Sequence, residues 1–199
     1  MRAFPRAALV AVMLVALLAA GCAKQGPKFE ASDITGASFG RDFALQDPQG
    51  RTRTLEDFRG KVVVVFFGYT NCPDVCPATL AALAQAMKEL GARSDRVQVL
   101  FITVDPSRDT ASLLAKYVPA FDPRFVGLRG DDDATAKVAK EFHVIYQKVP
   151  GATPGSYTVD HSAGSYVYDP QGRLRLYVAN GQGPDVFAHD IGLLLGARS

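Results

Sequence analysis

The sequence that decides the fold is Lys61-Val-Val-Val-Val-Phe-Phe67, followed directly by Gly68-Tyr-Thr-Asn-Cys72-Pro-Asp-Val-Cys76-Pro77. The first half is a continuous apolar run rich in β-branched residues, which is typical of a strand buried on both faces of a helix-covered sheet. The second half places two cysteines and two prolines ahead of Ala78–Leu90, whose apolar residues recur at helical spacing. We therefore expect a buried strand, a cysteine-bearing loop and a helix in immediate succession.

A second continuous apolar run, Val97–Val104, follows that helix. Strand, helix and strand in this order form a βαβ unit with two parallel strands. Capping residues and apolar periodicity predict three further helices, over Asp109–Tyr117, Asp131–Phe142 and Asp185–Leu195. In the first of these, Asp109 is expected to cap the helix.

Two identical tetrapeptides, Asp-Pro-Gln-Gly at Asp47–Gly50 and Asp169–Gly172, suit type I turns between strands. The expected hairpins pair Phe43–Leu45 with Thr52–Leu55, and Ser165–Tyr168 with Leu174–Val178. The element order predicts an α/β fold, with a central mixed sheet flanked by helices and an N-terminal β-hairpin. Because a cysteine motif follows the first buried strand and opens a helix, the expected architecture is thioredoxin-like.

The first 21 residues differ from the rest of the chain. Two arginines precede Ala7–Ala20, an unbroken apolar run that is shorter than the roughly 20 residues a membrane span needs. A small residue and Cys22 follow, which completes the pattern of a bacterial secretory signal. The segment Leu18-Ala-Ala-Gly-Cys22 resembles a lipoprotein processing site, although Ala19 stands where such sites prefer Leu.

We expect residues 1–21 to be a lipoprotein signal peptide and Cys22 to carry a lipid. Residues 22–35 are expected to form a tether and residues 36–199 to form one domain. The alternatives are an uncleaved N-terminal anchor and plain secretion, and all three place the domain outside the cytoplasm. The expected location is the periplasmic face of a bacterial membrane, with a lipid anchor.

Removal of the signal also changes the charge and the cysteine count. The whole chain has 22 basic and 20 acidic residues, but two of the basic ones lie within residues 1–21, so the remainder is formally neutral. We therefore expect no basic surface for nucleic acid. With Cys22 lipidated, two of the three cysteines remain as a pair, which suits an oxidising compartment.

The remaining pair, Cys72 and Cys76, is separated by three residues, whereas thioredoxin-type oxidoreductases separate their cysteines by two. The helix can begin at Pro77, with Cys76 as its cap, or at Pro73, with both cysteines one turn apart. Either start places both thiols near a helix N-terminus, where the dipole is expected to lower a thiol pKa. Helical residues four apart have Cβ atoms about 5–6 Å from each other. A metal ion bridges that gap without strain, and a disulfide, at about 3.8 Å, does so with local adjustment.

A metal held by two thiolates needs a further ligand, and His161 is the candidate. It lies in Tyr157-Thr-Val-Asp-His161-Ser-Ala-Gly164, which is expected to be a loop just before a strand. In a thioredoxin-like fold that loop lies beside the cysteine-bearing start of the helix. His143, which follows a predicted helix, and His189, on the polar side of the last one, are interpreted as structural.

Together these residues resemble the Sco (SenC/PrrC) family, copper chaperones of cytochrome c oxidase assembly, over roughly Phe39 to Leu195. The resemblance rests on the Gly68–Pro77 motif, on Thr103-Val-Asp105-Pro-Ser-Arg108-Asp-Thr110 and on Val159-Asp160-His161-Ser162. It implies a thioredoxin fold that binds one copper ion, as Cu(I), Cu(II) or both, through Cys72, Cys76 and His161. It also implies delivery of copper to the dinuclear copper centre of oxidase subunit II, with other copper chaperones as further partners.

The chemistry of these residues agrees with that implication. Two thiolates and an imidazole suit Cu(I), and the imidazole also allows Cu(II). Asp160 is a candidate to orient the second ring nitrogen of His161, as carboxylates behind metal ligands do. Asp105 and Arg108 are interpreted as fixing the turn after the second buried strand rather than touching metal.

The main alternative is a dedicated thiol–disulfide oxidoreductase in which Cys72 and Cys76 form the redox pair, reducing the copper-site cysteines of an oxidase or acting in redox sensing. Such enzymes usually carry Pro before the strand that faces the cysteines, where this chain has Val-Asp-His161-Ser, so general oxidoreductase activity is disfavoured. A peroxiredoxin is disfavoured because Thr70 lies two rather than three residues before Cys72. We therefore expect a metallochaperone rather than an enzyme, with a non-catalytic structural or redox-signalling module as the remaining alternative.

Overall fold

The computed structural model describes residues 28–196. The expected signal peptide (residues 1–21), the expected lipid site at Cys22 and the first part of the expected tether lie outside the described residues. Within residues 28–196, no helix is both long enough and apolar enough to cross a membrane.

The strands of the described chain belong to three sheets. They are β1 (Ser32–Asp33), β2 (Leu45–Gln46), β3 (Thr52–Arg53), β4 (Val62–Gly68), β5 (Val97–Thr103), β6 (Val126–Leu128), β7 (Tyr146–Pro150), β8 (Tyr157–His161), β9 (Ser165–Tyr168) and β10 (Leu174–Val178). The main sheet has the order β1-β10-β9-β4-β5-β6, in which β4, β5 and β6 are parallel and β9 is antiparallel to β4. The predicted mixed sheet is therefore confirmed.

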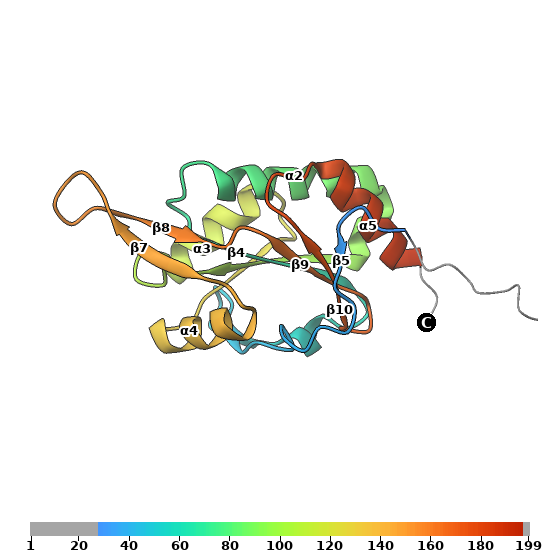
Figure 1. Ribbon diagram of the computed structural model, residues 1–199, viewed down its shortest axis with the longest axis horizontal. Coiled ribbons are helices and arrows are strands. Elements are labelled where there is room, and N and C mark those ends of the chain that lie inside the picture. The colour runs from blue at the N-terminus through green and yellow to red at the C-terminus, as the bar shows by residue number, and fades with distance from the viewer. Residues whose placement is uncertain (1–27, 197–199) are drawn as a thin grey trace, which may run out of the picture.

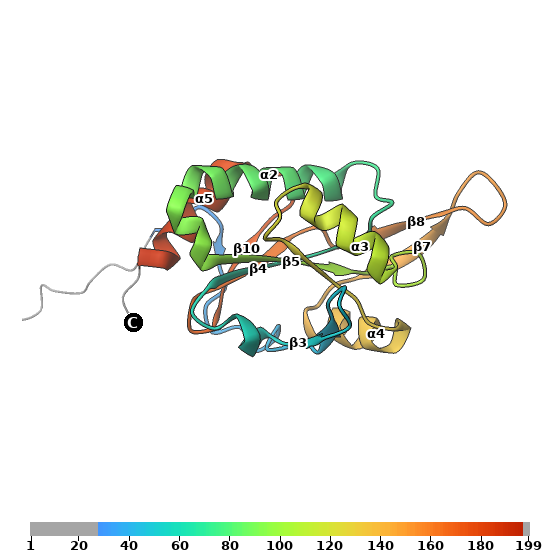
Figure 2. The ribbon, with the colours of Figure 1, turned by 180° about the vertical axis from the view of Figure 1, so that it is seen from behind.

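Helices cover the main sheet from both sides. Three helices, α2 (Val75–Leu90), α3 (Ala111–Tyr117) and α5 (Pro184–Gly196), lie on one side, and α4 (Asp132–Glu141) lies on the other with the β2–β3 hairpin (Figures 1 and 2). Short 3-10 turns are formed by Leu55–Phe58, Gly91–Arg96 and Val118–Ala120. The α/β, thioredoxin-like architecture with a helix-flanked sheet and an N-terminal hairpin is confirmed.

The centre of the molecule is the parallel pair β4 and β5. Every residue of both strands is buried, as their apolar sequences predict. Their register places Gly68 at the end of β4 opposite Thr103 at the end of β5. The loops that follow the two strands therefore emerge side by side at the carboxyl edge of the sheet, where α/β folds place their sites.

Two helices begin at other residues than predicted. Helix α2 begins at Val75 with Asp74 in the cap position, so it starts at neither of the two prolines considered. Helix α3 is capped by Thr110, whose side chain accepts a hydrogen bond from the Leu113 amide. Asp109, the predicted cap, is instead fully buried and directed toward other partners.

The prediction of a loop around His161 is wrong, because this segment forms the second strand of a hairpin. Strand β8 pairs antiparallel with β7, and His161 is its last residue. This two-stranded ribbon lies outside the main sheet and projects from the body of the molecule (Figure 1). Only Val159 of β8 is buried, so the segment lacks the apolar pattern that identifies a strand in the sequence.

The predicted tether extends too far toward the domain. The amides of Glu30 and Ala31 donate hydrogen bonds of 3.0 and 2.8 Å to the buried carboxylate of Asp190 in α5. Strand β1 then pairs with β10 at the edge of the main sheet. The packed structure therefore begins near Glu30, several residues before the predicted boundary at residue 36.

Candidate metal centre

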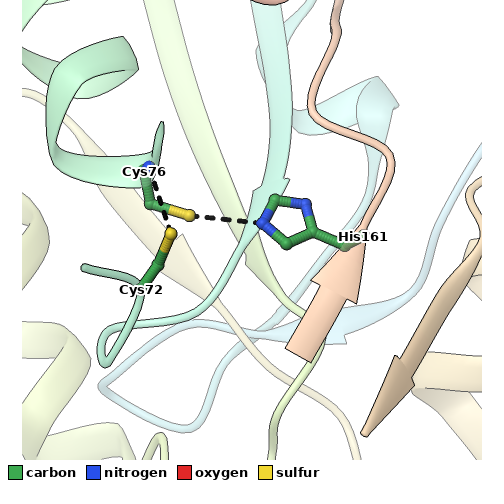
Figure 3. Close-up of side chains that lie close together, drawn as sticks. All are labelled: Cys72, Cys76 and His161. Atoms are coloured by element: carbon green, nitrogen blue, oxygen red, sulfur yellow. Dashed lines mark hydrogen bonds between the residues drawn. The ribbon is translucent and has the colours of Figure 1, made fainter. Parts of the chain in front are cut away.

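The two cysteines lie at the junction between β4 and α2. Cys72 is half-buried in the loop, and Cys76 is fully buried in the first turn of the helix. The Cys76 amide donates a hydrogen bond of 3.4 Å to the Cys72 sulfur, so the two side chains face each other (Figure 3). The junction thus gathers both thiols at the carboxyl end of the central strand.

Gly68 makes this close packing possible. A Cβ atom at this position would lie 2.7 Å from the Cys76 sulfur and 2.8 Å from the Phe101 ring. Both distances are shorter than van der Waals contact, so the end of β4 accommodates the buried thiol only because the residue there has no side chain.

The electrostatics of Cys76 differ from the prediction. Burial raises the pKa of the Cys76 thiol well above its ordinary value, and the nearby Cys72 sulfur and Asp109 carboxyl raise it further. The position in the first helical turn favours thiolate, but desolvation of a fully buried sulfur is the larger effect. In the metal-free protein Cys76 is therefore a neutral thiol, and a bound cation would have to displace its proton.

The structure brings His161 to the two cysteines from the end of β8. Its Nε2 atom lies 3.5 Å from the Cys76 sulfur (Figure 3). Its Nδ1 atom lies 3.0 Å from the Ser162 carbonyl oxygen, to which it donates a hydrogen bond. That bond leaves the lone pair on Nε2, directed toward the thiols, which is the arrangement a metal-ligating histidine requires.

Aromatic rings surround the imidazole. The rings of Tyr69 and Phe66 meet the His161 ring edge-on, at centroid distances of 5.9 and 6.4 Å. Burial among them lowers the pKa of His161, against the opposing effects of the Ser162 hydrogen bond and the Asp160 charge. The ring is therefore held neutral, as a metal ligand must be.

The three donor atoms satisfy the geometry of a small metal site. The Cys72 and Cys76 sulfurs and a ring nitrogen of His161 all lie within 4.8 Å of one another. Bonds of roughly 2.0–2.3 Å, the zinc values used as a guide, place sulfur and nitrogen about 3.8 Å apart in a trigonal site. Two soft sulfurs and one imidazole form a donor set for a soft or borderline metal such as copper or zinc.

A cavity of about 350 Å³ opens beside the donor atoms. One wall is the loop and first turn from Cys72 to Val75, and the other is the edge of β8 from Thr158 to His161. Because Cys72 and His161 line this cavity, both can be reached from solvent, while Cys76 is covered.

Asp160, His143 and His189, the other residues considered from the sequence, contribute no donor atom to the site. Asp160 is exposed, and the orienting hydrogen bond predicted for it comes from the Ser162 carbonyl instead, so that prediction is corrected. The His143 ring stacks on Phe39 at 4.5 Å, and His189 lies 2.8 Å from an Asp190 oxygen. Within residues 28–196, neither of these histidines joins the group of potential metal ligands.

Thr70, Asp109 and Tyr157 were not predicted from the sequence to have a role at the site. Thr70 and Asp109 form hydrogen bonds with each other, and Tyr157 forms one with Asp105. The Thr103–Thr110 motif was the available signal, since two acids and an arginine there follow a buried strand at the site edge. Its interpretation as a fixed turn is confirmed by the Arg108 and Asp109 amides, which donate to the Asp105 carbonyl.

Comparison with known proteins adds independent information. A family model described as SCO1/SenC matches residues 31–196. The mitochondrial protein SCO2 homolog of Bos taurus is 44% identical over 138 residues, which are 68% of this chain and 52% of that protein. The chain thus spans about half the length of this curated relative.

Two solved structures resemble most of the described region. ScoI of Bradyrhizobium japonicum, solved with copper bound, is 38% identical with a TM-score of 0.71 and covers 78% of this chain and 98% of its own. Apo Sco1 of Thermus thermophilus is 40% identical with a TM-score of 0.75, covering 84% of this chain and 97% of its own. With its cysteine pair, its histidine and the family match over nearly all described residues, this chain belongs to the SCO1/SenC family.

Proposed function

We propose that the protein carries one copper ion as cargo on Cys72, Cys76 and His161. The observation that carries the proposal is the convergence of two sulfurs and an imidazole nitrogen within 4.8 Å of one another. The copper-bound ScoI of Bradyrhizobium japonicum, 38% identical to this chain, supports copper over zinc as the cargo.

The donor set accommodates both common oxidation states of copper. The two thiolates and the imidazole hold Cu(I) in a three-coordinate site, and the imidazole raises the affinity for Cu(II) relative to sulfur ligands alone. Binding to the neutral Cys76 thiol releases its proton, so copper competes with protons at this residue.

The proposed destination is the dinuclear copper centre of cytochrome c oxidase subunit II, with other copper chaperones as donors of the ion. Membership of the SCO1/SenC family supports this assignment. The open cavity beside Cys72 and His161 supports transfer by ligand exchange, because incoming thiolates can reach the ion from that side. A buried Cys76 then releases the ion last.

We place the protein at the periplasmic face of a bacterial membrane, anchored by a lipid on Cys22. The signal-like residues 1–21 and the lipoprotein processing pattern that ends at Cys22 support this location. Mass spectrometry of the N-terminal peptide tests it, since the proposal requires an acylated Cys22 at the mature N-terminus. An unmodified Cys22 within an intact leader would contradict it.

Copper titration of the reduced full-length protein tests the cargo. The parent should bind one equivalent of Cu(I) and of Cu(II). Cys72→Ala and Cys76→Ala should lose tight binding of both, and His161→Ala should lose mainly Cu(II) binding. Incubation of the loaded protein with the soluble copper domain of subunit II should transfer copper to that domain. Copper affinity unchanged in His161→Ala would contradict the three-ligand site.

A second function is supported by the free, adjacent thiols. Cys72 is the more exposed sulfur and Cys76 the buried one, which suits attack by Cys72 on a partner disulfide and resolution by Cys76. The reaction oxidises the Cys72–Cys76 pair to a disulfide and reduces the partner disulfide to two thiols. Reduction of an oxidised subunit II copper-site peptide by metal-free protein would support it, and no thiol exchange would exclude it.

A further inference from the structure

The turn from Thr103 to Thr110 lies between the two halves of the donor set but contributes no donor atom. It follows β5 and contains two fully buried carboxylates, Asp105 and Asp109. Burial raises the pKa of Asp109 despite its hydrogen bonds. A carboxyl group at this position therefore costs stability, which indicates that its contacts have a specific role. The contacts of the two carboxylates differ, and each is directed to one half of the site.

Asp109 holds the cysteine half. It accepts hydrogen bonds from the Thr70 hydroxyl at 2.6 Å and from the Thr70 amide at 3.1 Å. It also accepts one from the Thr103 hydroxyl at 2.6 Å, which ties it to the end of β5. Since Thr70 lies two residues before Cys72, this carboxylate fixes the start of the cysteine-bearing loop.

Asp105 and Arg108 hold the histidine half. The Tyr157 hydroxyl donates a hydrogen bond of 2.8 Å to Asp105, which also forms an ion pair with Arg108. Arg108 donates in turn to the Tyr157 carbonyl at 2.9 Å, and its guanidinium lies 3.7 Å from the Tyr157 ring centroid. Tyr157 is the first residue of β8, the strand that ends in His161. Its hydroxyl, its carbonyl and its ring are therefore all in contact with Asp105 or Arg108.

The ribbon needs such an attachment. A two-stranded hairpin is marginally stable by itself, and β7–β8 shares no strand pairing with the main sheet. The turn that holds it is itself fixed, because Arg129 donates hydrogen bonds to the carbonyls of Pro106 and Asp109. The position of His161 relative to the thiols therefore depends on contacts made four residues earlier at Tyr157.

We propose that the Thr103–Thr110 turn is a positioning element that places the two halves of the donor set separately. Asp109 sets the Cys72 loop through Thr70, and Asp105 with Arg108 sets His161 through Tyr157. As regards copper, this inference rests on the proposed function. Its consequence is a division by oxidation state, since the thiols dominate Cu(I) binding and the imidazole adds chiefly to Cu(II) binding.

The metal-loaded experiment compares one conservative variant of each half. Tyr157→Phe, with Arg108→Lys as a second route to the same half, should lower Cu(II) affinity by about tenfold and leave Cu(I) affinity close to the parent value. Asp109→Asn should lower the affinity for both ions by about tenfold. Controls are Tyr168→Phe, which loses a buried hydrogen bond to Gly40, and Asp122→Asn, which loses an ion pair with Arg124. Neither control residue is near the site, and both variants should bind as the parent does.

Two metal-free measurements keep the inference separate from the copper assignment. Hydrogen exchange at Asp160 and Ser162, whose amides face β7, should accelerate in Tyr157→Phe but not in Asp109→Asn. Alkylation of Cys72 should accelerate in Asp109→Asn but not in Tyr157→Phe. Equal effects of both variants on both halves, or effects no larger than those of the controls, would overturn the inference. A parent that binds no copper but shows this division would overturn the proposed function alone.

Discussion

The two halves of the candidate metal centre are built in different ways. The cysteine half is a contiguous junction of the central strand and a long helix, and its inner sulfur is fully buried. The histidine half is the end of a two-stranded ribbon outside the main sheet, held at Tyr157 by side-chain contacts. The site therefore combines a thiol pair fixed by the core with an imidazole whose position depends on a few polar bonds.

This difference suits a protein that both holds and releases a metal. Ligands fixed by a close-packed core move little, whereas a ribbon with few buried residues opens at lower free energy. The histidine is accordingly the donor that can leave or approach as the ion changes oxidation state or partner.

Gly68→Ala should have the largest effect, because it disturbs the fixed half. The added methyl group would lie 2.7 Å from the Cys76 sulfur and 2.8 Å from Phe101. Overpacking of this kind destabilises a fold by about 1–3 kcal/mol, and copper affinity should fall in both oxidation states. Chemical denaturation and copper titration measure the two effects.

Gly192→Ala in α5 is the matched control. Its methyl group would meet only the flexible end of Arg93, at 3.4 Å. Replacing Gly by Ala within a helix should stabilise the protein by about 0.5–1 kcal/mol and leave copper binding unchanged. If Gly68→Ala binds copper as the parent does, the cysteine half is less rigid than its packing indicates.

Thiol reactivity should differ strongly within the cysteine half. Cys72 is half-buried and lines the cavity, whereas Cys76 is fully buried and its pKa is raised by burial. Iodoacetamide, which reacts with thiolate, should therefore modify Cys72 long before Cys76 in the reduced, metal-free protein. Peptide mass spectrometry of timed samples identifies the labelled sulfur. Equal rates for both, in native protein, would contradict the packing of Cys76.

The pH dependence of stability should have opposite signs for the two halves. Burial lowers the pKa of His161, so the unfolded chain takes up a proton first and stability falls as the pH drops below about 6.5. Burial raises the pKa of Cys76, so the unfolded chain loses a proton first and stability falls as the pH rises above about 8.5. Urea unfolding of the reduced protein at pH values from below about 6.5 to above about 8.5 measures both slopes.

Two variants assign these slopes to their residues. His161→Gln should flatten the acid side relative to the parent, and Cys76→Ser should flatten the alkaline side. The difference between parent and variant isolates the contribution of the replaced residue. An acid slope that His161→Gln leaves unchanged would show that His161 is not held neutral by its surroundings.

Shortening the tip of the ribbon should have the smallest effect on stability and copper affinity. Replacing Ala152–Gly155 with Asn-Gly keeps the Gly151–Ser156 pair, whose backbone hydrogen bond closes the turn. Halving the loop length changes its closure free energy by only about 0.6 kcal/mol. Stability and copper affinity should stay near the parent values, because the contacts that Asp105 and Arg108 make with Tyr157 lie outside the replaced residues. A copper affinity that changes with the tip would show that the whole ribbon sets the site.

The same contrast explains what the sequence could and could not predict. The cysteine half can be predicted from one contiguous stretch of sequence. The apolar run Val62–Gly68 predicts a buried strand, and the prolines after it indicate that a helix begins nearby. His161 could be identified as a ligand by its motif and its resemblance to a family, although it lies 85 residues from Cys76. The strand that carries His161 could not be predicted, because β7 and β8 are short and largely exposed.

The supporting contacts escaped prediction for a different reason. Asp109 and Thr70 are 39 residues apart, and Asp105 and Tyr157 are 52 apart. No local pattern connects such pairs, and an acid before a helix equally predicts a cap, which is how Asp109 was interpreted. The rise in the Cys76 pKa was also unpredictable, because the helix position is visible in the sequence whereas the depth of burial is not.

X-ray absorption spectroscopy of the copper-loaded, full-length protein identifies the atoms that bind the ion. We expect two sulfur ligands and one imidazole nitrogen around the ion in the parent. In His161→Ala the imidazole contribution should disappear while both sulfurs remain. A parent spectrum without an imidazole nitrogen, or one that His161→Ala leaves unchanged, would contradict a site assembled from these two halves.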